Sequence, residues 1–312
     1  MAIPLPGAAL VAAESILALT PVAIKLTQLD PVSQIWSRIL TTAVLGYTVA
    51  GPGDRSLPRD EWTKAGALGY ANLLHVASSY ESFRNLPAGQ AMSLLYTYPL
   101  WNLVLNNLFN DVPISAREYG LMAVAAVGSI VLNLDPGKAA PTPLGRKASQ
   151  PWGIFMGLIM ALTESTMHVL LRNLGWRDPA KSVWVVNGVA AGWLGLFQGL
   201  QSLWHGNGDD WGLQSGTWSD AAALTAFHGV TMFSGYWLRF YAVPRLSVVT
   251  YSILSYAGLM ASYLFGLLFL GERPGWMSVV GALMILVSGI LLQMRPQVES
   301  EEAPLSGTHD SS

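Results

Sequence analysis

Long apolar stretches, separated by short polar connections, recur along this chain of 312 residues. A helix needs about 20 mostly apolar residues to cross a bilayer. Only 12% of the residues are charged, about half of the roughly 25% that is usual in soluble domains. Such a chain lacks the charges for a soluble surface, so the sequence predicts an all-α membrane protein. Ten stretches are candidate transmembrane helices: 8–27, 33–51, 62–80, 88–108, 116–133, 152–172, 182–204, 218–239, 246–270 and 276–294.

The two halves of the chain contain similar segments in the same order. Residues 269–292 align with 108–131 without a gap, which places Glu272 over Asp111. An Asp-Pro pair precedes a Trp at the same spacing twice, as Asp30-Pro31 with Trp36 and as Asp178-Pro179 with Trp184. The segment around Tyr98 also resembles the segment around Tyr256. These matches predict two copies of one helical unit.

Each copy would hold five transmembrane helices, and five is an odd number. If both copies fold alike, the second must therefore be inserted upside down. Inverted repeats are an architecture of secondary transporters, with the substrate site between the halves near the bilayer midplane. The predicted division is a first repeat at 1–134, a linker at 135–151, a second repeat at 152–295 and a disordered acidic and Ser-rich tail at 296–312.

Three motifs carry a resemblance to a known family. They are LGERP at 270–274 before a Gly- and Ala-rich last helix, ALTPVAIKL at 18–26, and NLPAGQAMSLLYTYPL at 85–100. The chain thereby resembles the EamA-type branch of the drug/metabolite transporter superfamily over about 8–294. The resemblance implies a ten-helix fold, cytosolic termini and alternating access around a central cavity. The first repeat departs from the pattern, since Asn110-Asp111-Val112-Pro113 replaces the GERP-type hairpin.

The distribution of Lys and Arg gives an orientation by the positive-inside rule. Connections on the side of the N-terminus hold more of these residues than those on the other side, so both termini are predicted in the cytosol. This assignment treats Arg239 as an inside residue, and Lys25 and Arg84 as outside residues.

Two acids lie inside the apolar stretches, where a charge is costly and usually functional. Glu164 is followed one helical turn later by His168, while Glu14 lies one and a half to two turns before Pro21, which should kink the first helix. Each acid either exchanges protons or binds substrate, or else pairs structurally with a neighbouring helix. Glu14 lies nearer the end of its stretch and is expected to be easier to hydrate.

Further polar residues share helix faces with aromatic ones. They either line a cavity or bridge helices. For the lone His75 a packing role is favoured over a proton-relay or substrate-contact role. The predicted cavity set is Glu14, His75, Tyr98, Asn102, Glu164, His168, Ser255 and Tyr256. By contrast, a role for Glu272 and Arg273 in capping the hairpin at the membrane interface is favoured over contact with solute.

The polar content of the stretches favours a secondary transporter of a small organic metabolite. Arg38 is the only basic residue well inside a stretch, and this favours a neutral, zwitterionic or cationic solute. A nucleotide-sugar or sugar-phosphate antiporter of the same superfamily is the alternative, because its anionic substrates would need Lys or Arg.

Other classes fit less well. A zinc protease motif is absent and the only Asp pair, Asp209-Asp210, lies in a Gly-rich loop, so an enzyme is not predicted. A membrane receptor or scaffold would not need inverted repeats. The predicted partners are a small-molecule substrate and the lipid bilayer, with a homodimer left open; no nucleic acid, metal or cofactor is expected.

Overall fold

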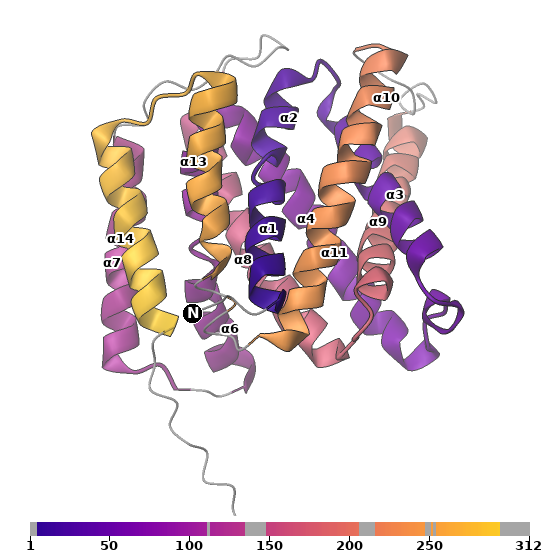
Figure 1. Cartoon of the computed structure of the whole chain (residues 1–312), viewed down its shortest axis with the longest axis horizontal. Coiled ribbons are helices and arrows are strands. Elements are labelled where there is room, and N and C mark those ends of the chain that lie inside the picture. Colours follow the sequence, from indigo (N-terminus) through magenta and orange to yellow (C-terminus); the bar gives the residue numbers. More distant parts are fainter. Residues whose placement is uncertain are drawn as a thin grey trace, which may run out of the picture.

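The computed structural model describes residues 5–110, 113–134, 148–205, 216–246, 251 and 254–293. Asp111, the Asp209-Asp210 pair, nearly all of the predicted linker and the predicted tail lie outside these residues. Within them the secondary structure is helical and forms one bundle (Figure 1). The α-helices are α1 (Leu5–Leu17), α2 (Thr20–Leu26), α3 (Pro31–Val49), α4 (Trp62–Asn85), α5 (Ala88–Leu95), α6 (Tyr98–Asn110), α7 (Ala116–Leu134), α8 (Gln150–Leu174), α9 (Pro179–His205), α10 (Trp218–Phe227), α11 (Phe233–Ala242), α13 (Ala257–Leu270) and α14 (Trp276–Gln293).

Helical residues occupy all ten of the predicted apolar stretches. Among the described residues, three segments are long and apolar enough to span a membrane by length and composition, namely Leu5–Leu26, Gln150–Leu171 and Pro179–Trp204. Ala257–Leu270 and Trp276–Leu292 are shorter apolar helices. The all-helical membrane class is thus supported, whereas ten crossings stay a prediction.

The predicted kink at Pro21 is present as a break. Helix α1 ends at Leu17, and α2 starts at Thr20 with Pro21 in its first turn. Proline has no N–H to donate, so it fits the start of a helix and interrupts its interior. A similar break separates α5 from α6, and one π-helical turn (η4, His228–Met232) joins α10 to α11.

Helices α7 and α14, whose sequences align, pack against each other and run antiparallel. Between α7 and α14, the Ser278 hydroxyl donates to the Leu132 carbonyl at 3.0 Å, and Arg117 donates to the Leu291 carbonyl at 3.0 Å. The residues of α7 therefore pair with those of α14 in reverse order. Figure 1 shows these two helices side by side at one edge of the bundle.

Helices α3 and α9 meet through a reciprocal contact of Trp and Gly. A Cβ on Gly46 would lie 2.8 Å from the backbone nitrogen of Trp184, and a Cβ on Gly195 would lie 3.6 Å from the ring of Trp36. Each Trp is the one that follows an Asp-Pro pair. Both Trp residues thus lie at the interface of α3 and α9, but Gly46 approaches the backbone of Trp184 and Gly195 approaches the ring of Trp36.

The Asp-Pro pairs themselves start α3 and α9. Asp30 accepts a hydrogen bond from the Ser33 N–H at 2.9 Å, and Asp178 accepts one from the Ala180 N–H at 2.9 Å. Pro follows at the first helical position in both cases. Acceptors at this place satisfy N–H groups that have no partner within the helix.

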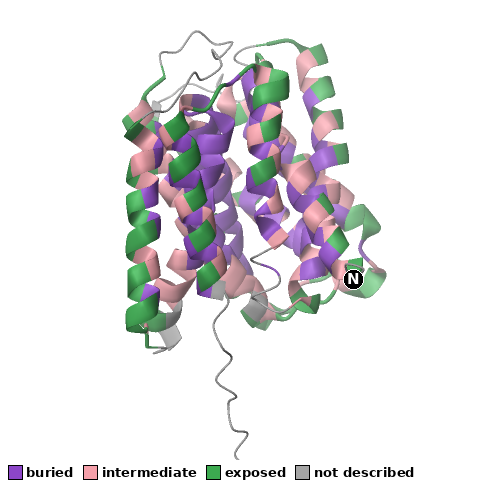
Figure 2. Ribbon diagram, turned by 60° about the vertical axis from the view of Figure 1, so that its left-hand side comes forward, coloured by how far each residue is buried: buried purple, intermediate pink, exposed green. Residues whose placement is uncertain are grey.

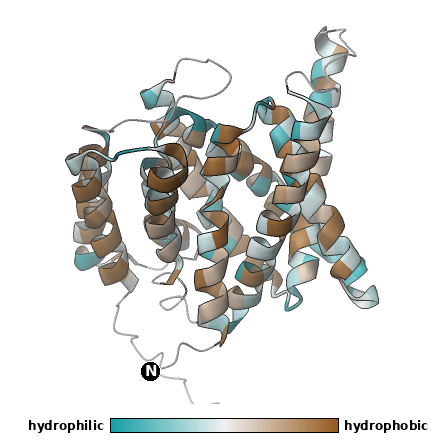
Figure 3. Ribbon diagram, turned by 45° about the horizontal axis from the view of Figure 1, so that its top comes forward, coloured by the Kyte–Doolittle hydropathy of each residue, from teal (hydrophilic) through white to brown (hydrophobic). Residues whose placement is uncertain are grey.

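The outer surface is apolar, unlike that of a soluble bundle. Large apolar side chains are exposed along many helices, among them Leu203, Trp204, Trp218 and Leu268. Figure 2 shows buried residues inside the bundle and exposed ones outside, and Figure 3 shows apolar residues along the same outer faces. An apolar exterior over several helices is the surface that a lipid environment requires.

Candidate functional site

One arginine joins two acids in the interior of the bundle. The Nε atom of Arg239 lies 3.0 Å from Oε1 of Glu14, and its Nη2 atom pairs with Oε1 of Glu164. These three residues come from α11, α1 and α8, and all are at least 90% buried. The cluster therefore connects the first half of the chain with the second half at their common core.

Polar side chains surround both acids. Tyr96 donates from its hydroxyl to Oε2 of Glu14 at 3.0 Å. On the other side, Nδ1 of His75 lies 3.5 Å from Oε2 of Glu164, and Nε2 of His168 lies 3.7 Å from Oε1 of Glu164. The predicted pairing of Glu164 with the histidine one turn later is thus present in the structure.

Tyr251 contacts both Arg239 and His168. It accepts a hydrogen bond from Nε of Arg239 at 2.9 Å, and its hydroxyl lies 3.2 Å from Nε2 of His168. Arginine, acid, histidine and tyrosine consequently form one connected network. A proton or a charged solute that enters this network changes the charge felt by every member.

The remaining predicted residues border this network. The Tyr98 and Ser255 hydroxyls lie 3.0 Å apart. The hydroxyl of Ser165, the residue that follows Glu164, donates a hydrogen bond to Asn102. The ring centroid of Tyr256 lies 5.3 Å from that of Tyr96. The structure thus brings the eight predicted residues into one region, and their contact with a solute stays a prediction.

Little space is left around the cluster. The void beside it measures about 40 Å³ and has Glu14, Arg38, His75 and Arg239 in its wall. On this measure one water molecule needs about 10–15 Å³, so the void has room for a few water molecules. A larger groove of about 690 Å³ lies elsewhere, between α5, α6, α7 and α8.

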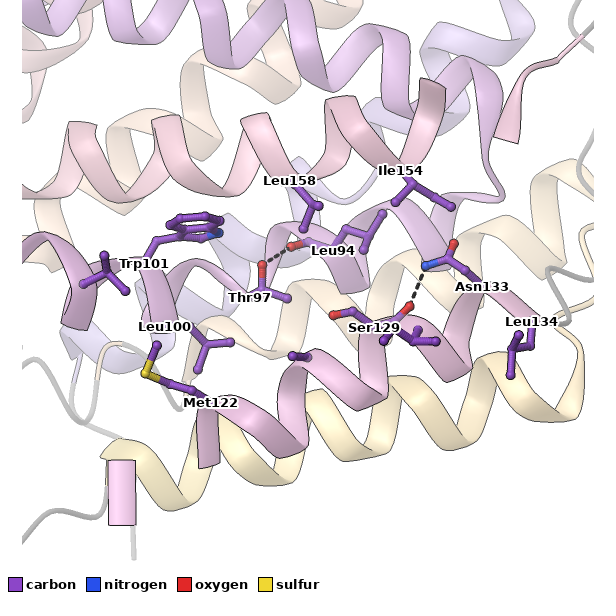
Figure 4. A pocket seen from close by; sticks show the side chains of 13 residues that line it. Leu94, Thr97, Leu100, Trp101, Met122, Ser129, Asn133, Leu134, Ile154 and Leu158 are labelled. Atoms are coloured by element: carbon purple, nitrogen blue, oxygen red, sulfur yellow. Dashed lines mark hydrogen bonds between the residues drawn. The ribbon is translucent and has the colours of Figure 1, made fainter. Parts of the chain in front are cut away.

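That groove is lined by apolar side chains, as Figure 4 shows for Leu94, Trp101 and Leu158. Its few polar groups are already bonded: the Thr97 hydroxyl donates to the Leu94 carbonyl at 2.7 Å, and Asn133 donates to the Ser129 carbonyl at 2.6 Å. None of the eight predicted residues lines it. We therefore place the candidate site at the charged cluster.

Arg239 was missed by the sequence analysis, and its assignment to a cytosolic connection is wrong. The residue is 8% exposed within α11, which continues to Ala242. Its two carboxylate partners offset the cost of removing a guanidinium from water. Glu14 and Glu164 both lie in apolar stretches that offer them no basic partner close in sequence. This could have indicated that a basic residue from another helix is buried beside them.

Lys25 and Arg84 are likewise buried and are not connection residues. Lys25 pairs with Glu272 and donates to the Leu86 carbonyl at 2.8 Å. Glu272 also accepts from the Ala88 N–H at 2.7 Å, so it caps the start of α5 rather than its own hairpin. Glu272 is only 3% exposed and is paired with a lysine from α2, and its expected position at the membrane interface stays a prediction.

The buried position of Arg239 also removes the reason for which a neutral, zwitterionic or cationic solute was favoured. Arg38 is not the only interior cation, because Arg239 lies between the two acids. Glu14 is 3% exposed and Glu164 is 2% exposed. Glu14 lies in the wall of the void and Glu164 does not, and the expected difference in hydration between them stays a prediction.

Comparison with known proteins agrees with this architecture. Residues 151–294 match the EamA-like transporter family. The resemblance to EamA-type transporters is confirmed. With the apolar exterior, the EamA match indicates an integral membrane protein of the transporter class. The curated proteins contain no match to this sequence.

Solved structures share the fold of this EamA-like chain. One, titled "Crystal structure of protein", matches with a TM-score of 0.57 and 14% sequence identity. The match covers 95% of this chain and 97% of the other. At this identity the likeness concerns the fold alone, and it extends the similarity beyond residues 151–294 to the first half.

Proposed function

We propose that the protein is a secondary transporter that moves a small organic solute by alternating access. Its ten apolar segments cross the membrane as two inverted five-helix repeats, and the termini lie in the cytosol. One observation supports the inversion: α7 and α14, whose sequences align, run antiparallel. In Figure 1, α1 begins and α14 ends on the same side of the bundle, as an even number of crossings requires.

The shared arginine is the observation that carries the proposal. Arg239 of the second half holds Glu14 of the first half and Glu164 of its own half. Ionised groups are costly inside a bilayer, and those that are retained there mark ion and substrate pathways. Two carboxylates with a single guanidinium between them can release or accept a proton, or exchange the arginine for a positively charged group of a solute.

The arrangement suits a change in shape between two states. Contacts of α1 with α11 and of α4 with α8 connect one half to the other. Breaks in the helices lie next to the cluster, between α1 and α2 and at η4. Breaks of this kind let helix segments tilt without breaking regular hydrogen bonds. Rocking of the halves would then open the cluster to one side of the membrane at a time.

The nucleotide-sugar or sugar-phosphate alternative is less well supported. Phosphate groups carry up to two negative charges and are recognised by forks of Arg and by Lys. In the described interior, Arg239 and Lys25 are already paired with carboxylates, and in the wall of the void Arg38 is the other arginine beside Arg239. A small metabolite with at most one negative charge therefore fits the cluster better.

Uptake into proteoliposomes tests the proposal. Purified protein would be reconstituted and supplied with radiolabelled pools of amino acids, amines, sugars, sugar phosphates and nucleotide sugars, with and without an imposed pH gradient. We expect one pool to accumulate, and the gradient to increase its uptake. Glu164→Gln cannot titrate and should bind that solute yet lose gradient-driven uptake, and Glu14→Gln should show the same loss. Failure of every pool to enter above empty liposomes would refute the transporter function.

A further inference from the structure

The groove of about 690 Å³ between α7 and α8 lies apart from the charged cluster. Its wall reaches from the core to the outer surface, because Leu94 and Thr97 are buried whereas Ile130 and Leu134 are exposed. Figure 4 shows Leu158 of α8 on one side of the groove and residues of α7 on the other. The groove is thus continuous with the apolar exterior that faces lipid.

The wall of the groove suits a hydrocarbon chain. None of the described residues that line it is charged. The Ser129 hydroxyl donates to the Ala125 carbonyl at 3.0 Å, and the side chains of Thr97 and Asn133 also donate to backbone carbonyls. A polar solute would lose its hydration there without gaining hydrogen bonds, which costs free energy. An acyl chain has no hydrogen bonds to lose.

The length of the groove matches one leaflet of a bilayer. Along α7 the groove extends from Met122 to Leu134, and a separation of twelve residues at about 1.5 Å each gives roughly 18 Å. The hydrocarbon core is about 30 Å thick, so one leaflet contributes about 15 Å. At the Leu134 end, Gln150 donates to the Asn133 carbonyl at 2.8 Å and Gln90 donates to Oδ1 of Asn133 at 2.7 Å. Neutral amides therefore lie at the end where the ester groups of a lipid would begin.

The groove shares one short segment with the charged cluster. Leu94 and Thr97 lie at the break between α5 and α6, where the Thr97 N–H donates to the Leu94 carbonyl at 3.1 Å. From the same break, the Tyr96 hydroxyl donates to Glu14 of the cluster. An occupant of the groove therefore contacts the backbone segment that positions Tyr96.

We propose that an acyl chain of a bilayer phospholipid occupies this groove and supports the break between α5 and α6, and through it the position of Tyr96. The site lies outside the proposed transport path, and it does not depend on what the protein transports. Helix α7 packs mainly against α14 and much less against α5. A chain that contacts both α7 and α8 consequently links the outer pair of helices to the rest of the bundle.

Photocrosslinking in vesicles tests the site. The full-length protein would be reconstituted in phosphatidylcholine vesicles that contain a small share of phosphatidylcholine with a diazirine in the middle of one acyl chain. After illumination, the labelled residues are located by mass spectrometry. We expect labels on the inner wall of the groove, at Leu94, Trp101 and Leu158, as well as on the outer faces of the bundle. Labels on the outer faces alone, the pattern that a second copy of the chain in the groove would give, would overturn the proposal.

Two matched variants on α7 separate the groove from the surrounding lipid. Ala126 lines the groove and Ala123, one turn earlier, does not, although both are exposed. Ala126→Trp fills the groove and should reduce labelling of the inner wall to background, whereas Ala123→Trp should leave it unchanged. If the tryptophan variant fails to fold, Ala126→Leu takes its place and should give a smaller loss. Wild-type labelling of the inner wall in a folded Ala126 variant would overturn the proposal.

Hydrogen exchange tests the link to the break between α5 and α6. Delipidated protein in detergent is compared before and after the addition of phosphatidylcholine. We expect the backbone amides of residues 96–98 to exchange more slowly with lipid in the wild type and in Ala123→Trp, and to show no such change in Ala126→Trp. Equal exchange with and without lipid in the wild type would overturn the support of the break. Both readouts are independent of uptake into proteoliposomes, so this proposal and the transport function can fail separately.

Discussion

Lys25 Nζ pairs with Glu272 Oε1, and their side chains are only 1% and 4% exposed. The two residues are far apart in the sequence and join the end of α2 to the turn after α13. Backbone groups of Leu86 and Ala88 complete the contact, which ties in the start of α5. The pair therefore fastens three segments together at one end of the bundle.

Removal of either partner should destabilise the fold. Lys25→Ala leaves a buried carboxylate, and Glu272→Ala leaves a buried ammonium group and an uncapped α5. Breaking a buried ion pair costs about 3–5 kcal/mol, so both variants should unfold at a clearly lower temperature in detergent. The adjacent Arg273 is exposed, and Arg273→Ala should melt like wild type. Wild-type melting of both single variants would show that the pair contributes nothing.

The three-residue cluster predicts a rescue. Arg239→Met should lower the Tm because it strands two buried acids. Adding Glu164→Gln removes one of those charges, so the double variant should be more stable than Arg239→Met alone, with a coupling of about 1 kcal/mol or more. Arg245→Met, at an exposed arginine in the turn after α11, is the control. Purely additive losses of stability would argue against the shared arginine.

The contact between α3 and α9 predicts different outcomes at two glycines. Gly46→Ala would place a methyl group 2.8 Å from the backbone of Trp184, so the helices must move apart. Overpacking of this kind costs about 1–3 kcal/mol. Gly195→Ala would make only a normal contact, at 3.6 Å from the ring of Trp36, and should be tolerated. Equal melting temperatures for the two variants would contradict the close approach at Gly46.

The proposed topology predicts which residues are reached from each side. The chain contains no cysteine, so single cysteines can be introduced at exposed arginines. Arg59→Cys and Arg177→Cys should react with a membrane-impermeant maleimide only after the membrane is permeabilised, so that the reagent reaches the cytosolic side. Arg273→Cys should react in intact cells. Labelling of all three from the same side would exclude inverted repeats with cytosolic termini.

Helix positions could be predicted from the sequence because each depends on a local run of apolar residues and on local breakers such as Pro21. The Asp-Pro pairs were noted only as a repeated spacing, and the structure shows that they start α3 and α9. Arg239 could not be placed in this way. Its position at the end of an apolar stretch is typical of a connection, and only its partners from two other helices explain its burial.

Lys25 and Glu272 show the same limit. Each is near the end of a stretch, where a charged residue is expected to contact water. They are buried because segments distant in the sequence bring opposite charges together. Conversely, Glu164 and His168 lie one turn apart on α8, so their proximity followed from helical spacing alone.

The void of about 40 Å³ has a consequence for leakage. A narrow space of this size limits the flow of water and ions past the cluster as long as the surrounding helices stay in place. Solute that enters must separate the helices that close the space. Affinity for the correct solute then supplies the free energy of opening, and a solute that binds poorly leaves the membrane sealed.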